Sequence, residues 1–144
     1  MALMITETNT GGLAMSSIEA VVLYSGLFVL LFVGLKLNAG RVRVATKVNF
    51  GEGASDPMTQ AMRVQGNAVE DVPITLLGLY GLAALSAPVL LIHLLGGSFL
   101  FFRVAHAVTL GSGSGSGLGR MIGTIGTLIV MLVTAGSAIW FALM

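Results

Sequence analysis

Long apolar stretches alternate with shorter polar ones along most of this chain. Residues 18–37, reading IEAVVLYSGLFVLLFVGLKL, carry charges only near their ends, at Glu19 and Lys36. About twenty such residues in a helix span the hydrocarbon core of a bilayer, which is roughly 30 Å thick. The pattern therefore predicts a first membrane helix at 18–37. Residues 1–17 lack the basic segment of a secretory signal and are expected to form a mobile tail.

The next polar stretch, residues 38–56, contains several glycines and is expected to be a loop. It ends at an Asp-Pro pair, which is typical of an N-cap followed by the first residue of a helix, so a second helix is predicted at 57–85. The apolar run that follows is too long for one helix, and residues 86–88 (SAP) offer a turn within it. A third helix is therefore predicted at 88–110.

A strict alternation of glycine and serine, GSGSGSG, follows the third predicted helix. It is typical of a flexible linker and is compatible with an engineered replacement. It is not a phosphate-binding loop, because no Lys-Ser or Lys-Thr pair follows it. We expect residues 111–119 to form a second loop and residues 120–143 a fourth helix. The predicted fold is an all-α integral membrane protein, a bundle of four transmembrane helices.

The composition agrees with a membrane protein and excludes several kinds of chemistry. The chain is 56% hydrophobic and 9% charged, with a mean hydropathy of +0.97, whereas soluble domains carry about 25% charged residues. Because cysteine is absent, disulfides, a protein thiolate nucleophile and Cys-based metal sites are excluded. A net charge of +1 argues against nucleic acid as a partner, since binding phosphates needs a basic patch.

The distribution of basic residues predicts the orientation. All of them lie on or toward the side of the two predicted loops: Lys36, Arg41, Arg43, Lys47, Arg63, Arg103 and Arg120. By the positive-inside rule, both loops are expected in the cytoplasm and both chain termini outside.

One face of the second predicted helix carries three polar side chains. Arg63, Asn67 and Glu70 are spaced i, i+4 and i+7, so they share one face, and the uncharged residues 72–92 follow closely. Charged groups at membrane depth cost roughly 2.5 to 3.5 kcal/mol each on insertion scales and usually mark function. This face is therefore the first candidate for a functional site.

Further polar residues are expected at the same end of the bundle, and together they suit a small anionic ligand that also carries an amine. They are Arg41 or Arg43, Gln65, Asp71, Arg103, His106 and Arg120. Arginine can clamp a carboxylate with two hydrogen bonds, and Glu70 can bind an ammonium group. Arg120 at the start of a helix would add its charge to the positive end of the helix dipole and stabilise a ligand thiolate.

These motifs resemble a known family. The pattern Arg63-x3-Asn67-x2-Glu70 with Pro73 following, the RVAH segment at 103–106 and Arg120 are similar to the signature of the MAPEG family, the membrane-associated proteins in eicosanoid and glutathione metabolism. The resemblance covers about residues 18–144 and is closest to small bacterial members, which implies a bacterial inner membrane.

The resemblance implies a homotrimer with glutathione as co-substrate, bound between neighbouring subunits near the cytoplasm. Arg120 would be the catalytic residue that stabilises the thiolate. The residues implied to hold glutathione are Arg41, Arg63, Gln65, Asn67, Glu70, Arg103 and His106. Leu110 stands where well-studied eicosanoid enzymes carry a tyrosine, and Asp71 where some carry an aromatic residue, which argues against a specific eicosanoid synthase.

Two functions remain open from the sequence. The first is a glutathione-dependent transferase or peroxidase acting on a lipophilic electrophile that enters from the membrane lipid. The alternative is a non-catalytic membrane module with the same fold, which binds lipid or another anionic metabolite. A transporter is disfavoured because no inverted repeat with broken helices is visible.

Each candidate residue also has a structural interpretation. The polar face of the second helix can pair internally with Arg103, since buried charges need partners, and Arg120 can be an interfacial anchor. His93 is expected to be satisfied or solvated, because no second metal ligand is spaced to join it; no metal site is predicted.

Overall fold

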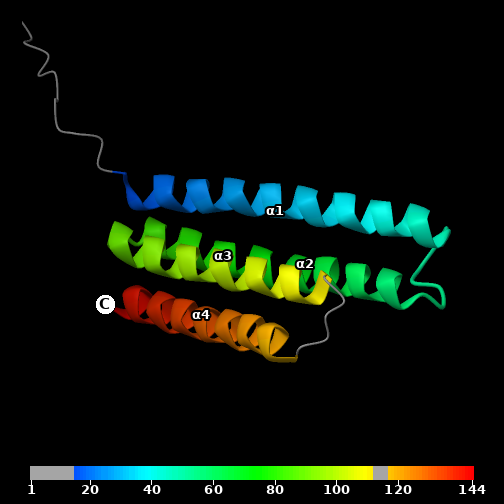
Figure 1. Ribbon diagram of the computed structural model, residues 1–144. Helices are drawn as coiled ribbons and strands as arrows, with labels where there is room; N and C mark the ends of the chain where they lie inside the picture. Colours follow the sequence, from blue (N-terminus) through cyan, green and yellow to red (C-terminus); the bar gives the residue numbers. More distant parts are fainter. Residues whose placement is uncertain (1–14, 112–116) are drawn as a thin grey trace, which may run out of the picture.

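The computed structural model describes residues 15–111 and 117–144, and this part of the chain forms four helices without a strand. They are α1 (Ser17–Thr46), α2 (Asp56–Ala84), α3 (Val89–Gly111) and α4 (Gly117–Leu143) (Figure 1). Helices α1, α3 and α4 are each long and apolar enough to cross a membrane, and α2 has a polar first half. The predicted all-α membrane bundle is confirmed.

Helix α1 begins with a capping box and extends well past the predicted end. The Glu19 carboxylate accepts a hydrogen bond from the Ser16 amide (2.8 Å), and Ser16 Oγ accepts one from the Glu19 amide (3.3 Å), so two backbone donors at the helix start are satisfied. The helix ends at Thr46, and its C-cap, Lys47, has a left-handed φ of 56°. The loop predicted over 38–56 is therefore wrong for residues 38–46.

Packing against α2 explains the extension of α1. Ala39 is buried together with Met58 and Ala61 of α2, and Val42 packs against the same cluster. These contacts offset the cost of a glycine inside a helix, about 1 kcal/mol relative to alanine, here at Gly40. Tertiary packing on an apolar stripe stabilises helices more than local propensity does.

The starts of α2 and α4 also differ from the prediction. The N-cap of α2 is Ser55, whose Oγ accepts a hydrogen bond from the Met58 amide (3.4 Å), and the predicted cap, Asp56, is already helical. Helix α3 extends to Gly111 and α4 begins at Gly117, so the loop predicted over 111–119 is wrong for residue 111 and for residues 117–119. Gly119 lies against Thr109 of α3, which brings this first turn into contact with the bundle.

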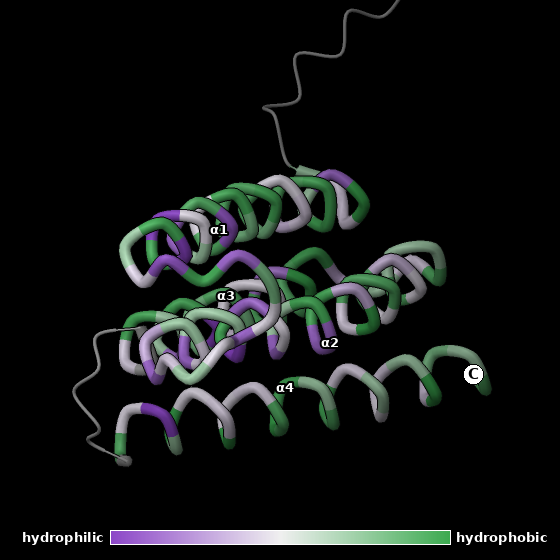
Figure 2. The backbone as a smooth tube through the Cα atoms, turned by 90° about the vertical axis from the view of Figure 1, so that its right-hand side faces the viewer, coloured by the Kyte–Doolittle hydropathy of each residue, from purple (hydrophilic) through white to green (hydrophobic). Residues whose placement is uncertain are grey.

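The four helices run up and down in three layers, with α2 and α3 between α1 and α4 (Figures 1 and 2). Within the described residues, α1 and α4 do not touch each other, whereas α2 contacts both. The apolar centre includes Phe28 of α1 and Phe99 of α3, whose ring centroids are 5.0 Å apart, and Leu79 of α2. Helix α2 therefore has one side toward α1 and another toward α4.

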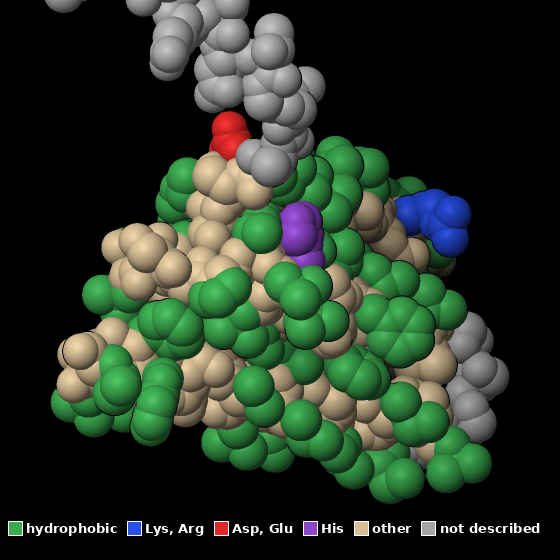
Figure 3. Space-filling model, turned by 90° about the vertical axis from the view of Figure 1, so that its left-hand side faces the viewer, with side chains coloured by type: hydrophobic (Ala, Val, Ile, Leu, Met, Phe, Trp, Pro, Cys, Tyr) green, Lys and Arg blue, Asp and Glu red, His purple; other side chains and the backbone are tan. Residues whose placement is uncertain are grey.

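The two ends of the bundle differ in polarity. All seven basic residues lie near the end where α1 and α3 finish and α2 and α4 begin, which we name the basic end. Hydrophilic segments gather there, over the α1–α2 connection and the start of α4 (Figure 2). The opposite end presents mostly hydrophobic side chains (Figure 3). Candidate polar chemistry is thus concentrated at one end.

Candidate functional site

A pocket of about 300 Å³ opens at the basic end between α2, α3 and α4. We name it the polar pocket; it is lined by Thr59, Gln60, Arg63, Asn67, His106, Arg120 and Thr124. Four of the predicted site residues, Arg63, Asn67, His106 and Arg120, are therefore brought together from three helices. Thr59 and Thr124 were not predicted, although each stands four residues from one of the two arginines, a spacing that shares a helix face.

Gln65 and Glu70 lie elsewhere, in a pocket of about 530 Å³ on the α1 side of α2. We name it the α1–α2 pocket; its other lining residues are Lys36, Ala39, Gly40, Arg43, Met62, Gly66 and Val69. Because α2 stands between α1 and α4, its polar side chains are divided between two pockets, with Glu70 at the boundary of the face that it shares with Arg63. Residues that were predicted to share one ligand are thus separated within a single protomer.

His106 is buried and uses both of its ring nitrogens inside the bundle. Asn67 Nδ2 lies 3.3 Å from His106 Nε2, and Thr124 Oγ1 lies 3.3 Å from His106 Nδ1. Thr124 donates its single hydroxyl hydrogen to the Arg120 carbonyl at 2.9 Å, so its oxygen must accept the proton of Nδ1. Nε2 then accepts a hydrogen bond from the Asn67 amide. His106 therefore orients Asn67 and ties α2, α3 and α4 together.

The polar pocket is rich in positive charge. Arg63 and Arg120 are exposed, no carboxylate lines the pocket, and neither arginine has an ion-pair partner among the described residues. Arg120 lies in the first turn of α4, where the helix dipole is positive. An anion bearing a carboxylate or a thiolate fits these two charges.

Arg103 serves the interior of the bundle. Its side chain is only 3% exposed, and Nη1 donates to Asp71 Oδ2 at 2.5 Å, which joins α3 to α2. Its Nε has no hydrogen-bond partner among the described residues. The internal partner of Arg103 is thus Asp71, not a residue of the polar face considered from the sequence, and Arg103 does not line the polar pocket.

Arg41 and Arg43 point to different sides of α1. Two residues along a helix differ by about 200° in direction. Arg43 lines the α1–α2 pocket and donates to the carbonyls of Val48 and Gly51, both at 3.2 Å, so it stabilises the α1–α2 connection. Arg41 is exposed and lines neither of the two pockets.

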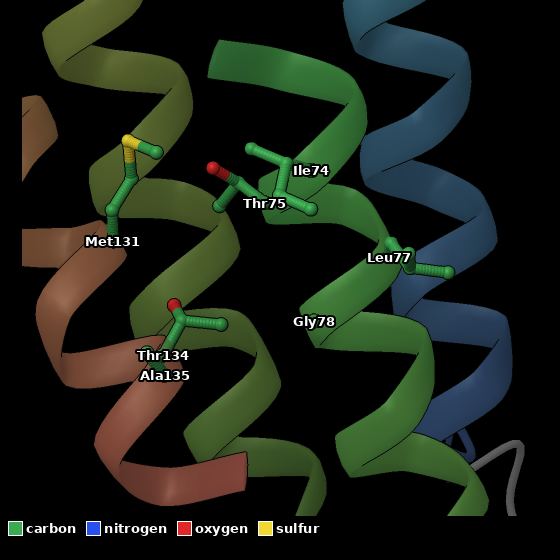
Figure 4. A pocket seen from close by; sticks show the side chains of 7 residues that line it. All are labelled: Ile74, Thr75, Leu77, Gly78, Met131, Thr134 and Ala135. Atoms are coloured by element: carbon green, nitrogen blue, oxygen red, sulfur yellow. The ribbon is translucent and has the colours of Figure 1, made fainter.

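An apolar pocket of about 330 Å³ lies between α2 and α4, two of the three helices that line the polar pocket, and beyond that pocket (Figure 4). Its lining residues are Ile74, Thr75, Leu77, Gly78, Met131, Thr134 and Ala135. It begins seven residues after Asn67 on α2 and seven after Thr124 on α4, which is about 10 Å along the bundle. The polar and apolar pockets are therefore aligned on one helix pair.

Little site chemistry is found at the opposite end of the bundle. His93, half-buried, has its Nδ1 3.1 Å from the Tyr24 hydroxyl, which also lies 3.2 Å from the His93 carbonyl. This pairing agrees with the prediction of a satisfied histidine. Within residues 15–111 and 117–144, no group of three His, Cys, Asp or Glu side chains is placed to bind a metal.

Comparison with known proteins gives a family match and curated relatives. A model described as the MAPEG family matches residues 21–140. Inner membrane protein YecN of Escherichia coli (strain K12) is 30% identical over 84 residues, which are 58% of this chain and 64% of YecN, less than two thirds of its length. YecN of E. coli O6:H1 (strain CFT073) matches to the same extent. No solved structure matches the chain.

Proposed function

Because this chain belongs to the MAPEG family, we propose that it is a glutathione-dependent transferase or peroxidase that acts on a lipophilic electrophile. The observation that carries this proposal is the pairing of Arg63 and Arg120 in one pocket, without a carboxylate among its lining residues and in line with an apolar pocket on the same helices. Such a site suits one anionic reactant and one apolar reactant.

In this proposal, glutathione binds in the polar pocket through its charged groups. Arg63 pairs with a carboxylate of the tripeptide, and Asn67, oriented by His106, contributes its free amide oxygen. Arg120 faces the sulfur, where its charge and the positive end of the α4 dipole favour the thiolate over the thiol. The thiolate is the nucleophile that the chain itself, without cysteine, cannot supply.

The apolar pocket would bind the second substrate close to this sulfur. In a transfer reaction, the thiolate forms a bond to an electrophilic carbon, and the electron pair passes to the leaving group or to an adjacent acceptor atom that is then protonated. In peroxide reduction, the thiolate attacks one peroxide oxygen, the O–O bond breaks and an alcohol leaves. A second glutathione then reduces the sulfenic acid, which yields disulfide and water. Arg120 contributes by stabilising the reactive thiolate.

The division of polar residues around α2 supports a site shared between subunits. Gln65 and Glu70 line the α1–α2 pocket, whereas Arg63 and Asn67 line the polar pocket. Gln65 lies about 200° around α2 from Arg63, and Glu70, about 20° from Arg63, lies at the boundary between the two pockets. In the proposed homotrimer, the α1–α2 pocket of one subunit meets the polar pocket of its neighbour, and glutathione lies between them. Glu70 then binds the glutathione ammonium group from the neighbouring subunit.

We further propose that the basic end faces the cytoplasm and that the membrane is the bacterial inner membrane. The positive-inside rule supports the first statement, because all seven basic residues lie toward that end. Similarity to an E. coli inner membrane protein supports the second. Cytoplasmic glutathione would then reach the polar pocket directly.

The test is equilibrium binding of glutathione to the detergent-purified protein by isothermal titration calorimetry. We expect binding by the wild type, a loss of at least tenfold in affinity for Arg63→Ala, and wild-type affinity for Lys47→Ala. Lys47 is an exposed cation that lines none of the described pockets, so it controls for net charge. A folded protein that binds no glutathione would overturn the proposal.

Turnover distinguishes the enzyme from the non-catalytic module. With a lipophilic electrophile such as a chlorodinitrobenzene or an organic hydroperoxide, the enzyme is expected to consume glutathione, and Arg120→Ala to abolish this while the protein stays folded. Binding of glutathione without turnover of either reagent class would favour the module that binds an anionic metabolite.

A further inference from the structure

A fourth pocket, a groove of about 500 Å³, lies between α1 and α3 and is separate from the polar, α1–α2 and apolar pockets of the proposed active site. It is lined by Leu30, Leu31, Gly34, Leu35, Asn38, Val64, Val104, Ala107 and Val108. Every one of these is apolar except Asn38, and Val64 of α2 is buried. The rims are open, since Leu30 and Val108 are largely exposed. The groove is therefore a surface channel with a single polar group.

The channel leads toward an unpartnered positive charge. Arg41 follows Asn38 by three residues on α1, so it lies about 60° away in direction and about 4.5 Å farther along the axis. Leu30 and Gly34, which line the groove, occupy the same side of the helix as Arg41. Among the described residues, Arg41 is exposed and has neither an ion pair nor a hydrogen bond. An amide and a free guanidinium therefore stand at the basic end of the channel.

We infer that this groove is a binding site for an anionic phospholipid. One acyl chain lies along the apolar channel between α1 and α3, and the phosphate meets Arg41, with the Asn38 amide as a second donor. Along α1 the groove presents an apolar channel, then a neutral donor at Asn38, then a cation at Arg41. A phospholipid presents its tail, glycerol region and phosphate in that order.

Arg43 shows why the assignment falls on Arg41. Its guanidinium donates to two carbonyl oxygens of the α1–α2 connection and lies 3.3 Å from the sulfur of Met62. It faces the α1–α2 pocket, on the other side of α1 from the groove. Of the two arginines at the end of α1, Arg41 has the free donors and the correct side for a lipid phosphate.

The test of the head-group contact uses native mass spectrometry of the full chain released from detergent micelles that contain phosphatidylglycerol or phosphatidylethanolamine. Since a basic residue beside an anionic lipid contributes about a fivefold preference, we expect the wild type to retain phosphatidylglycerol about fivefold better. Arg41→Gln is expected to lose this preference. Lys47→Gln, which removes the same charge from the same end of α1 but far from the groove, is expected to keep it.

The test of the channel uses two matched glycines of α1. A Cβ atom at Gly34 or at Gly26 would meet nothing within 4 Å, so a side chain can start at either position without a clash, but only Gly34 lines the groove. Gly34→Leu is expected to remove bound phospholipid of both kinds, whereas Gly26→Leu is expected to retain it.

Three results would overturn the inference. One is equal retention of the two lipids by the wild type, and another is a phosphatidylglycerol preference that survives Arg41→Gln. The third is a Gly34→Leu protein that keeps its bound phospholipid but dissociates into fewer subunits than the wild type. That result would show that the groove contacts a second copy of the chain and not a phospholipid. Arg41→Gln changes an exposed side chain and does not threaten folding, so it decides the question even where Gly34→Leu fails to fold.

Discussion

Arg103 and His106 are one helical turn apart on α3 and are both buried, yet they meet different partners. Arg103 pairs with a carboxylate of α2, and His106 joins an amide of α2 to a hydroxyl of α4. Removing one partner of either interaction lowers the free energy of unfolding, because a buried charge or ring nitrogen is then left without a hydrogen-bond partner in the protein interior. These two residues support the site by stabilising the bundle around it.

The ion pair gives a prediction about stability. Asp71→Asn is expected to lower the free energy of unfolding by about 2 to 3 kcal/mol, somewhat below the range for fully buried pairs, because Asp71 is 31% exposed while Arg103 is 3% exposed. The neighbouring Glu70→Gln, which breaks no ion pair among the described residues, is expected to change it by less than about 0.5 kcal/mol. Unfolding in mixed micelles with increasing dodecyl sulfate measures both.

A double variant provides the check on this interpretation. Arg103→Met combined with Asp71→Leu removes both charges and is expected to recover most of the lost stability. An Asp71→Asn protein as stable as the Glu70→Gln protein would show that the pair contributes little.

At the residue scale, the sequence predicted the right neighbours for some side chains and not for others. The spacing of Arg63 and Asn67 placed both on one face of α2, and the structure brings them together with Arg120. The separate position of Gln65 follows from its spacing, because two residues along a helix from Arg63 is a change of about 200° in direction. The position of Glu70 in the α1–α2 pocket was not predictable from spacing, because it depends on how α1 covers α2. Helical periodicity gives directions around one axis but not the neighbours in those directions.

Among the elements, α3 and α4 make the most extensive contact in the bundle. A Cβ atom built on Gly123 would lie 2.9 Å from the backbone nitrogen of His106, and one on Gly126 would meet the ring of Phe102. Small residues at such positions allow membrane helices to approach closely, and this approach supplies van der Waals packing where the hydrophobic effect is absent. The approach also brings Thr124 within reach of His106.

This packing predicts opposite effects for two glycines of α4. Gly123→Ala is expected to lower the free energy of unfolding by about 1 to 3 kcal/mol, since the backbone of α3 must move. Gly136→Ala is expected to raise it by up to about 1 kcal/mol, because alanine favours the helix and a Cβ there meets nothing within 4 Å. The same dodecyl sulfate titration measures both, and equal effects would contradict the proposed close contact.

The elements were more predictable than their ends. Runs of apolar residues long enough to cross a bilayer can be read directly from the sequence. The helical membrane class is therefore predictable from the sequence. The C-terminal end of α1 cannot be predicted from apolar runs, because residues 38–46 include polar residues and a glycine. Their helical state depends on contacts of Ala39 and Val42 with α2, which only the assembled bundle provides.

At the scale of the whole molecule, the layers place two polar surfaces on different sides of each protomer. The α1–α2 pocket lies on the side of α1, and the polar pocket lies on the side of α4. In the proposed trimer, these surfaces meet at three equivalent boundaries, because a closed ring repeats one contact between unlike faces. The detergent-free mass would then be three times the 14.8 kDa of one chain.

Mixed oligomers test whether a site draws on two subunits. Arg120→Ala alters the polar pocket, and Gln65→Glu places a negative charge in the α1–α2 pocket, so each variant alone is expected to be inactive. When the two are co-expressed in equal amounts, about one quarter of the boundaries combine two intact faces. Turnover per chain is therefore expected to recover to about one quarter of the wild-type value.

The control mixture is Arg120→Ala with Arg63→Ala. Both residues line the polar pocket of the same protomer, so no boundary regains an intact pocket and no recovery is expected. Failure of the first mixture to recover, with both variants folded and assembled, would indicate that each site is complete within one chain.

The unexpected length of α1 affects how the two reactants reach the proposed site. Thirty residues extend for about 45 Å, whereas the oily interior of a bilayer is about 30 Å thick, so the last turns of α1 and the first turns of α2 stand in the water beyond it. The mouth of the polar pocket begins among those turns, at Thr59, while the aligned apolar pocket lies deeper in the bundle. For the proposed enzyme, this geometry amounts to phase-transfer catalysis: a salt-like reactant and an oil-like reactant arrive from two immiscible liquids, and neither has to dissolve in the other's solvent.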